Sequence, residues 1–250
     1  MYGMGSVGIR KGRGMAQYSD VTAVVLDIDG TLCSLTHGVG SIYHRLLRAQ
    51  GLESDRIALE AAVRHVWSAF RDTYLNVAEG YRTTHERERE VWCEFVQRVC
   101  EAANLPYGGD PSVVASIYSA FASRAYRRVE AGATEFLRQA QERGLTLVAA
   151  SNNDSRSKVT LNELGLDPYL SDIVFAGDLG WKKPSPKFYA TIAKRMGMAP
   201  SKILHVGNDR ELDVDAARRA GFEAVLYAPQ GQSSESAVSS FTELGVLLGL

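Results

Sequence analysis

The sequence predicts an α/β fold in which helices cover both faces of a parallel sheet and a separate helical domain is inserted into the chain. Three observations predict it. Short apolar runs alternate with helical patterns, which is typical of consecutive βαβ units. The first run, Val21–Leu26, is rich in β-branched residues, as in strands buried on both faces of a sheet. Residues 34–124 instead space their apolar residues as helices do.

The later elements follow from the same two patterns. Further apolar runs predict strands at Leu145–Ala150, Asp172–Phe175, Ile203–Val206 and Ala224–Tyr227. Three helical stretches between these runs end in a residue that suits the left-handed position closing a helix, namely Gly144, Gly165 and Gly221. Another helix is expected to begin at Ser185-Pro186 and to stop at Gly197, because serine caps a helix and proline suits its first turn.

The inserted segment is expected to contain helices and no strand. Its apolar residues recur at helical spacing in three stretches, which include Ile42 and Leu46, then Val63, Val66, Trp67 and Phe70, then Val91, Trp92 and Phe95. Asp110-Pro111 opens a further helix, and the charged run His85–Glu90 is expected to be a solvated helix start. Ligands of open α/β sheets bind outside the carboxyl ends of the strands. An insertion after the first strand would therefore lie over them as a lid.

These patterns divide the chain into three parts. Residues 20–33 and 125–250 are expected to form the sheet core, and residues 34–124 the helical cap. Residues 1–19 are rich in glycine, lack the apolar segment of a signal peptide and are expected to be a disordered tail. The sequence leaves the start codon open between Met1, Met4 and Met15.

Composition excludes several classes of function. A formal net charge of -1 gives no general electrostatic footprint for nucleic acid or an anionic membrane, so neither is expected as a partner. No run of about 18 apolar residues predicts a transmembrane helix. The three cysteines, Cys33, Cys93 and Cys100, show no disulfide or zinc spacing and favour a reducing, cytoplasmic location.

The candidate chemistry is concentrated directly after the first predicted strand, in the sequence DIDGT. The spacing of Asp27 and Asp29 puts both carboxylates on one side of an extended chain. Gly30 allows a sharp turn and the close approach of a ligand. Two acids so close together can take different roles. One can stay ionised beside a cation and act as a nucleophile, while the other transfers protons. The alternative interpretation is a simple turn after a strand.

From Val21 to Tyr227 the sequence resembles the haloacid dehalogenase superfamily. VVLDIDGTL matches the first motif of that family, and VAASNN, with Ser151 at a strand end, matches the second. GWKKP matches the third, with Lys183 before proline, and HVGNDRELDVDAARRAG is similar to the fourth. The resemblance implies a Rossmann-like core, a helical cap that opens and closes over the site, and phosphatase chemistry.

The resemblance also implies the catalytic roles. Asp27 is expected to attack phosphorus and form an aspartyl-phosphate, while Asp29 protonates the leaving oxygen and then deprotonates water. A Mg²⁺ cofactor would offset the negative charge that otherwise repels the carboxylate nucleophile. Its candidate ligands are Asp27, Asp29, Asn208, Asp209 and Asp213.

Phosphate-binding groups are implied by the same match. Thr31, the Ser151 hydroxyl and the Asn152 N–H are expected to hold the phosphoryl oxygens. Lys183 would add a fixed positive charge, and Lys182, the competing lysine, is assigned to solvent because the family places the functional lysine next to proline. The alternative for Ser151 and Asn152 is an N-cap of the next helix.

The fourth motif departs from the family pattern. An acid usually follows its glycine, but here Asn208 follows Gly207, with Asp209 and Asp213 beyond. An asparagine offers Mg²⁺ only a neutral carbonyl oxygen. The sequence leaves three outcomes open. Asn208 binds the metal directly, Asp209 binds it instead, or metal binding is weak. Asp209 and Asp213 can also be read as acids favoured at a helix start.

The function predicted from these features is Mg²⁺-dependent hydrolysis of a small phosphomonoester. A true dehalogenase is disfavoured because Asp29, the proton shuttle, is present. A phosphotransferase or phosphomutase is the closer alternative, since only the acceptor differs. A non-catalytic binding member is a third, supported by Asn208 alone. The sequence leaves the individual phosphomonoester and the oligomeric state open.

Overall fold

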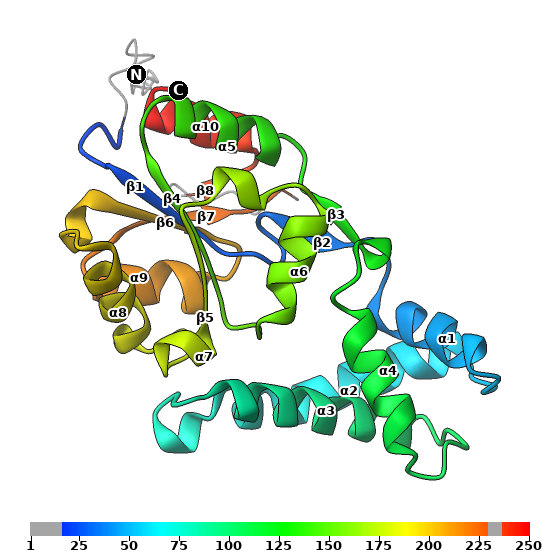
Figure 1. Ribbon diagram of the computed structural model, residues 1–250. Coiled ribbons are helices and arrows are strands. Elements are labelled where there is room, and N and C mark those ends of the chain that lie inside the picture. The colour runs from blue at the N-terminus through cyan, green and yellow to red at the C-terminus, as the bar shows by residue number, and fades with distance from the viewer. Residues whose placement is uncertain (1–16, 230–236) are drawn as a thin grey trace, which may run out of the picture.

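A computed structural model gives the structure of the protein over residues 17–229 and 237–250 (Figure 1). Residues 1–16 of the predicted tail lie outside these ranges. Residues 17–19 were expected to be disordered, but they belong to a turn that packs against the core. In that turn the Tyr18 N–H donates to the carbonyl of Leu247 in the last helix (3.1 Å).

Six parallel strands form one sheet in the described residues, in the order β5-β4-β1-β6-β7-β8. They are β1 (Ala23–Leu26), β4 (Thr146–Ser151), β5 (Asp172–Phe175), β6 (Ile203–Gly207), β7 (Glu223–Tyr227) and β8 (Ala237–Val238). The five predicted strands are confirmed within two residues at either end. Strand β8 was not predicted, because two residues are too few to show a pattern.

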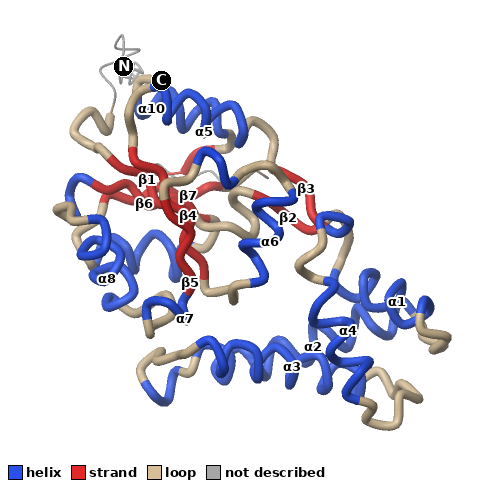
Figure 2. The backbone as a smooth tube through the Cα atoms, in the orientation of Figure 1, coloured by secondary structure: helices blue, strands red, loops and turns tan. Residues whose placement is uncertain are grey.

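Helices cover both faces of the sheet, as predicted (Figure 2). One face carries α5 (Ala133–Glu142), α6 (Arg156–Glu163) and α10 (Phe241–Leu248), and the other carries α7 (Ala176–Leu179), α8 (Pro186–Met196) and α9 (Ala216–Arg219). Successive residues of a strand serve opposite faces, as the two-residue period of a strand requires. In β1, Val24 packs with the first set of helices and Val25 with the second.

Four helices between β2 and β3 form a separate layer, here called the helical unit. They are α1 (Val39–Ala49), α2 (Arg56–Leu75), α3 (His85–Ala102) and α4 (Pro111–Ala120). The unit has its own apolar core, which agrees with the helical periodicity of this segment. In the part of the chain that the structure describes, no helix combines the length and the apolar character needed to cross a membrane.

A short antiparallel ribbon connects the helical unit to the sheet. It pairs β2 (Cys33–Leu35) with β3 (Arg127–Val129), with Cys33 opposite Val129. The expectation of no strand in residues 34–124 was therefore wrong at its first two residues. A three-residue strand shows no alternation, and its partner lies some ninety residues away, so local sequence could not reveal the pairing.

The topology brings three motifs to one edge of the sheet. Strand β1 lies between β4 and β6, and all three run parallel. Their carboxyl ends therefore place Asp27, Ser151 and Gly207 side by side, on the side of the sheet that faces the helical unit (Figure 1).

Candidate active site

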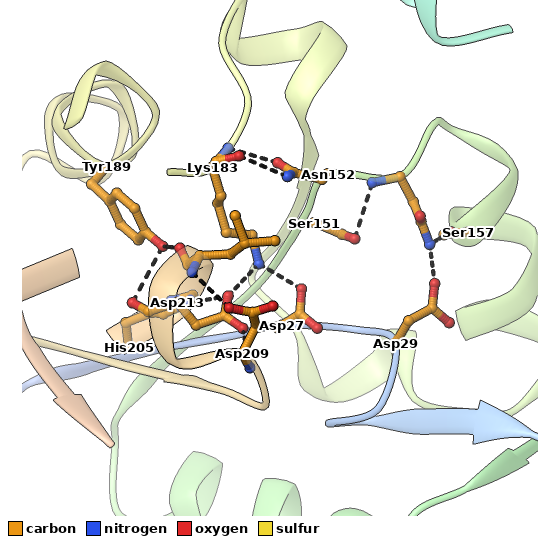
Figure 3. Close-up of polar contacts among 12 residues, drawn as sticks. Asp27, Asp29, Ser151, Asn152, Ser157, Lys183, Tyr189, His205, Asp209 and Asp213 are labelled. Carbon is orange, nitrogen blue, oxygen red and sulfur yellow. Dashed lines mark hydrogen bonds and ion pairs between the residues drawn. The ribbon is translucent and has the colours of Figure 1, made fainter. Parts of the chain in front are cut away.

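Asp27 lies at the carboxyl end of the central strand and is almost fully buried. Its N–H donates to the carbonyl of Val206 in β6 (2.8 Å), so the neighbouring strand fixes its backbone. Lys183 Nζ lies 2.5 Å from Asp27 Oδ1 and 2.6 Å from Asp213 Oδ1 (Figure 3). One ammonium group is thus shared by two carboxylates from different segments.

The charges of this buried cluster affect one another. Burial raises the pKa of Asp27 to about 6, although the Lys183 ammonium opposes the rise. Burial also acts to raise the pKa of Asp213, but Lys183 and His205 outweigh it and hold that pKa below its ordinary value. Burial acts to lower the pKa of Lys183, and the two carboxylates raise it above the ordinary lysine value. Near pH 7 the cluster carries two negative charges and one positive, and this net charge suits a further cation.

Asp213 is held by several partners at once. Its Oδ1 also contacts His205 Nε2 (3.1 Å), and its Oδ2 accepts the Asp209 N–H (3.0 Å). A Cβ on Gly207 would lie 2.2 Å from the Asp213 carboxyl carbon, so only glycine leaves room for this carboxylate. Burial lowers the pKa of His205, and the neutral ring donates from Nε2, while Nδ1 has no partner among the described residues. Both carboxylate oxygens of Asp213 therefore have protein partners, and one of them positions the Lys183 ammonium.

The Asn152 side chain fixes the backbone of Lys183. Its Nδ2 donates to the Lys183 carbonyl (2.9 Å), and its Oδ1 accepts the Lys183 N–H (2.7 Å). The hydroxyl of Tyr74 in α2 donates to the Asn152 carbonyl (3.2 Å), which connects the helical unit to the same residue. The sequence prediction concerned only the Asn152 N–H. It missed the role of the side chain, because nothing in the polar run after β4 distinguishes this amide from its neighbours.

The turn after Asp27 requires a glycine for two reasons. Gly30 has a φ of 80°, and a Cβ there would lie 2.3 Å from Asn208 Nδ2. Asn208 therefore packs directly on the turn. Thr31 is fully buried, and its Oγ1 has no hydrogen-bond partner in the described part of the chain. A buried hydroxyl without a partner is consistent with the phosphate-binding role predicted for Thr31.

Asp29 is directed away from the Asp27–Lys183 pair (Figure 3). Its carboxylate forms an ion pair with Arg127 of β3 and accepts a hydrogen bond from Asn153 Nδ2. Burial lowers the pKa of Arg127 to about 10, so its guanidinium is still charged near pH 7. Sequence reasoning missed both partners. Arg127 lies 98 residues beyond Asp29 and belongs to no motif, so only the β2–β3 ribbon brings the two together.

Asp209 acts as a helix cap. Its Oδ1 accepts the N–H groups of Glu211 and Leu212 (2.9 Å each) at the start of the π-helical turn Arg210–Asp215. This is the alternative that the sequence left open for an acid at this position. The Ser151 hydroxyl also has a local partner, because its Oγ accepts the Asn153 N–H (3.1 Å).

The predicted metal ligands are oxygen donors, but the structure does not gather them all. Among residues 17–229 and 237–250, no group of three or more His, Cys, Asp or Glu side chains is placed to hold a metal ion. Mg²⁺ needs only one or two carboxylates, because it usually keeps several waters. The net negative charge around Asp27 and the exposed Asn208 amide fit such an ion, whereas Asp209 and Asp213 already have partners.

Lys182 corrects the sequence interpretation most clearly. The lysine expected in solvent is fully buried, and its Nζ lies 2.8 Å from Oε2 of Glu88, which is fully buried as well. Its ammonium also lies 3.4 Å from the centre of the Tyr74 ring. Glu88 was expected in a solvated run, but it precedes Val91 by three residues and Phe95 by seven. It thus lies on the apolar face of α3, a signal that the run of charges obscured.

Backbone contacts surround this buried pair. The Thr83 N–H donates to the carbonyl of Gly180 (3.1 Å), and the Lys182 N–H donates to that of Tyr81 (2.9 Å). The helical unit is thus attached to the segment that carries Lys183, in addition to its connection through the β2–β3 ribbon.

A cavity of about 550 Å³ lies between the turn after β1 and the helical unit. Asp29, Gly30 and Asn208 line it from the side of the sheet, and side chains of all four helices of the unit line it from the other. Its volume falls within the ordinary range for small-molecule sites. A ligand in this cavity would contact the residues of the first and fourth motifs.

Known proteins are similar to this chain over most of its length. A family model described as haloacid dehalogenase-like hydrolase matches residues 21–221. Haloacid dehalogenase-like hydrolase domain-containing protein 3 of Bos taurus is 29% identical over 218 residues, covering 86% of this chain and 84% of the relative. A glyceraldehyde 3-phosphate phosphatase of Methanopyrus kandleri (strain AV19) is 26% identical over 213 residues, covering 82% and 83%.

Solved structures share the fold. An L-2-haloacid dehalogenase superposes with a TM-score of 0.72 at 19% identity, over 92% of this chain and 99% of that one. Relatives of this chain thus include proteins named as phosphatases, and both curated relatives and solved structures named as dehalogenases. The choice between these two reactions has to come from the residues of the site.

Proposed function

Because the chain belongs to the haloacid dehalogenase-like hydrolase family, we propose that it hydrolyses a small phosphomonoester through an aspartyl-phosphate on Asp27. One observation carries the proposal. The buried Asp27 carboxylate meets the Lys183 ammonium at 2.5 Å, at the carboxyl end of the central strand. This pair puts a nucleophile beside a fixed positive charge, the combination that phosphoryl transfer needs.

The reaction has two steps. Asp29 first takes up a proton and leaves its ion pair with Arg127. An Asp27 oxygen then forms a bond to phosphorus, the ester P–O bond breaks, and the leaving oxygen takes the proton from Asp29. Water then attacks phosphorus, Asp29 accepts its proton, and the bond between Asp27 and phosphorus breaks to release inorganic phosphate. Lys183 and the Thr31 hydroxyl, which has no partner among the described residues, would stabilise the phosphoryl oxygens during both steps. The net reaction consumes one water and yields an alcohol and phosphate.

A magnesium ion fits this site on charge. Asp27, through the carboxylate oxygen that does not meet Lys183, and the exposed Asn208 amide are the residues that would hold it, since both oxygens of Asp213 have protein partners and Asp209 caps a helix. When bound, the ion offsets the repulsion between the substrate dianion and the carboxylate nucleophile.

Asp29 favours phosphoryl transfer over dehalogenation. Halide leaves as a stable anion and needs no proton, whereas an alkoxide leaving group does. Arg127 and Asn153 hold Asp29 at the cavity, where the alcohol would lie. A mutase would use the same residues with a hydroxyl acceptor in place of water, and a binding protein would keep them without turnover.

Phosphate release tests the proposal directly. The full chain is incubated with a panel of small phosphomonoesters, with Mg²⁺ and with chelator, and halide release from 2-chloropropionate is measured in parallel. Magnesium-dependent phosphate release without halide release is expected. Halide release alone would assign a dehalogenase, and neither product would favour a mutase or a binding protein.

Replacing Asp29 by asparagine should lower turnover most for substrates with poor leaving groups. For an alkyl phosphate we expect a loss of about 10²–10⁴-fold, the usual contribution of acid–base catalysis. For p-nitrophenyl phosphate the phosphorylation step should lose much less, because nitrophenolate departs without a proton. Burst kinetics with the two substrates measure that step. Equal losses for both would remove Asp29 from the role of general acid.

Replacing Asn208 by aspartate should tighten Mg²⁺ binding if Asn208 is a ligand. A carboxylate in place of a neutral amide is expected to lower the apparent dissociation constant by about 10-fold, because ligand charge tunes cation affinity. The matched control is Asp209→Asn, which preserves the helix cap, since both residues cap well. An unchanged titration for Asn208→Asp with weaker binding for Asp209→Asn would transfer the ligand role to Asp209.

A further inference from the structure

The cavity beside the site has an aromatic wall supplied by the helical unit. Trp67 of α2 and Trp92 of α3 stack with ring centres 6.3 Å apart, and Phe95 meets them edge-on at 5.7 and 5.9 Å. All three rings line the cavity, and the two tryptophans are only partly buried. Val39 and Val63 line it as well and are also partly buried. Covering such partly exposed apolar surface with another apolar surface is favourable, because it removes both surfaces from water.

The charged groups of the cavity are mostly paired with one another. Arg127 pairs with Asp29, and Arg156 pairs with Asp154 at 2.8 Å. Arg64 also lines the cavity and is exposed. Arg127 Nε and the indole N–H of one lining tryptophan have no partner among the described residues, so the lining still offers a ligand a small number of hydrogen bonds. Any ligand hydroxyl beyond that number loses its water partners where the lining is apolar. A polyhydroxylated leaving group, such as a sugar, is therefore poorly matched to this wall.

The two ends of the cavity thus differ in chemistry. Asp29, Gly30 and Asn208 form a polar end next to the proposed nucleophile, and the rings of α2 and α3 form an apolar wall. We propose that the substrate is the phosphomonoester of a bulky, largely apolar alcohol with an aromatic body. This inference rests on the proposed function of the same site. The phosphoryl group would lie at the polar end, and the hydrocarbon would lie against Trp67 and Trp92.

Substrates with matched leaving groups test this preference. 3-Phenylpropyl phosphate and glucose 6-phosphate are both esters of primary alcohols, so differences in leaving-group chemistry are small. With the full chain and Mg²⁺, kcat/KM is expected to be at least about 10²-fold higher for the phenylpropyl ester, the discrimination that a mismatched pocket reaches. Equal values, or a preference for the sugar ester, would overturn the inference while leaving the phosphatase proposal intact.

Two variants of the same helix test whether the preference for the phenylpropyl ester depends on the cavity wall. Val63→Asn puts an amide into the cavity wall, whereas Ile57→Asn changes an exposed residue of α2 that is 70% exposed and does not line the cavity. Val63→Asn is expected to lower the ratio of the two kcat/KM values by about 10-fold. Ile57→Asn should leave the ratio unchanged. Identical ratios in both variants would place the preference elsewhere and overturn the assignment of this wall.

Binding measurements separate failure of the inference from failure of the proposed function. If no ester releases phosphate, the proposed function fails, and binding of 3-phenylpropanol is measured by quenching of tryptophan fluorescence. Two of the three tryptophans of the chain line the cavity, so an occupied cavity should change the signal. Binding that Val63→Asn weakens and Ile57→Asn does not would still support an apolar ligand. No binding, or equal binding by both variants, would overturn it.

Discussion

The Asp27→Asn variant is expected to lose phosphate release by at least about 10³-fold, because it lacks the nucleophile on which the reaction depends. The fold should survive, since asparagine has nearly the same shape and Asp213 still pairs with Lys183. Release of inorganic phosphate with Mg²⁺ measures the loss. The matched control is Asp20→Asn, just before the other end of β1, where the side chain is 89% exposed and turnover should not change.

The same variant should be more stable than the wild type near pH 7. Burial raises the pKa of Asp27 from 3.8 to about 6, so the folded state holds this proton more strongly than the unfolded state does. The contribution of Asp27 to stability therefore falls as pH rises from 3.8 through about 6. Its ionised form costs the fold roughly 2–3 kcal/mol above that window, by the conversion of a pKa shift into free energy.

Urea unfolding in the presence of chelator checks this gain. At pH 7 the free energy of unfolding should be higher for Asp27→Asn than for the wild type, and below pH 4 the two should converge. Retained turnover in the variant would end the assignment of Asp27 as nucleophile. Lower stability at pH 7 would show that the ionised carboxylate stabilises the fold instead.

Replacing Glu88 by alanine is expected to destabilise the protein by about 3–5 kcal/mol, the usual effect of leaving a buried charge without its partner. Lys182 and Glu88 have no exposed side-chain surface, and their charged atoms lie 2.8 Å apart. Without Glu88, the lysine must lose its proton or draw water into the interface between α3 and the sheet core. Chemical denaturation measures the loss, and Glu90→Ala, an exposed acid of the same helix, is the control.

The penalty in Glu88→Ala should depend on pH in a defined direction. Burial lowers the pKa of Lys182 to about 8 even with Glu88 present, and loss of the carboxylate should lower it further. The unfolded lysine keeps its proton up to about 10.5, so the unfolded state of the variant binds more protons. Its stability should therefore rise with pH up to that value, by as much as about 1.4 kcal/mol per pH unit. Wild-type Lys182 also loses its proton above about pH 8, so the difference between the variant and the wild type should narrow below pH 8 and then stay constant.

A double variant separates the ion pair from simple packing. Glu88→Leu combined with Lys182→Met removes both charges and keeps apolar volume, so most of the lost stability should return. If Glu88→Ala were no less stable than Glu90→Ala, the buried pair would have no energetic role. Because Lys182 adjoins Lys183, Glu88→Ala should also lower phosphate release, and the double variant should restore part of it.

The sequence alone predicted the sheet core, and its resemblance to a family pointed to Asp27 and Lys183 as the proposed reactive pair. Strands such as Val21–Leu26 are recognisable because burial on both faces demands uninterrupted apolar residues. Asp27 could be singled out from the DIDGT sequence directly after a predicted strand, whereas Lys183 was identified only because GWKKP resembles a motif of the family. The burial of a whole strand is visible in its own residues, because each of them has to be apolar.

The tertiary structure decided which side chains meet. Asp29 pairs with Arg127 only because a ribbon closes the long insertion, and Lys182 is buried only because α3 brings Glu88 onto it. Asn152 holds Lys183 through a side chain whose type alone gave no sign of that partner. These contacts join residues far apart in the chain, and their energies depend on burial that several elements create together. A single sequence predicts the elements, but the partners of a charged side chain depend on how those elements pack.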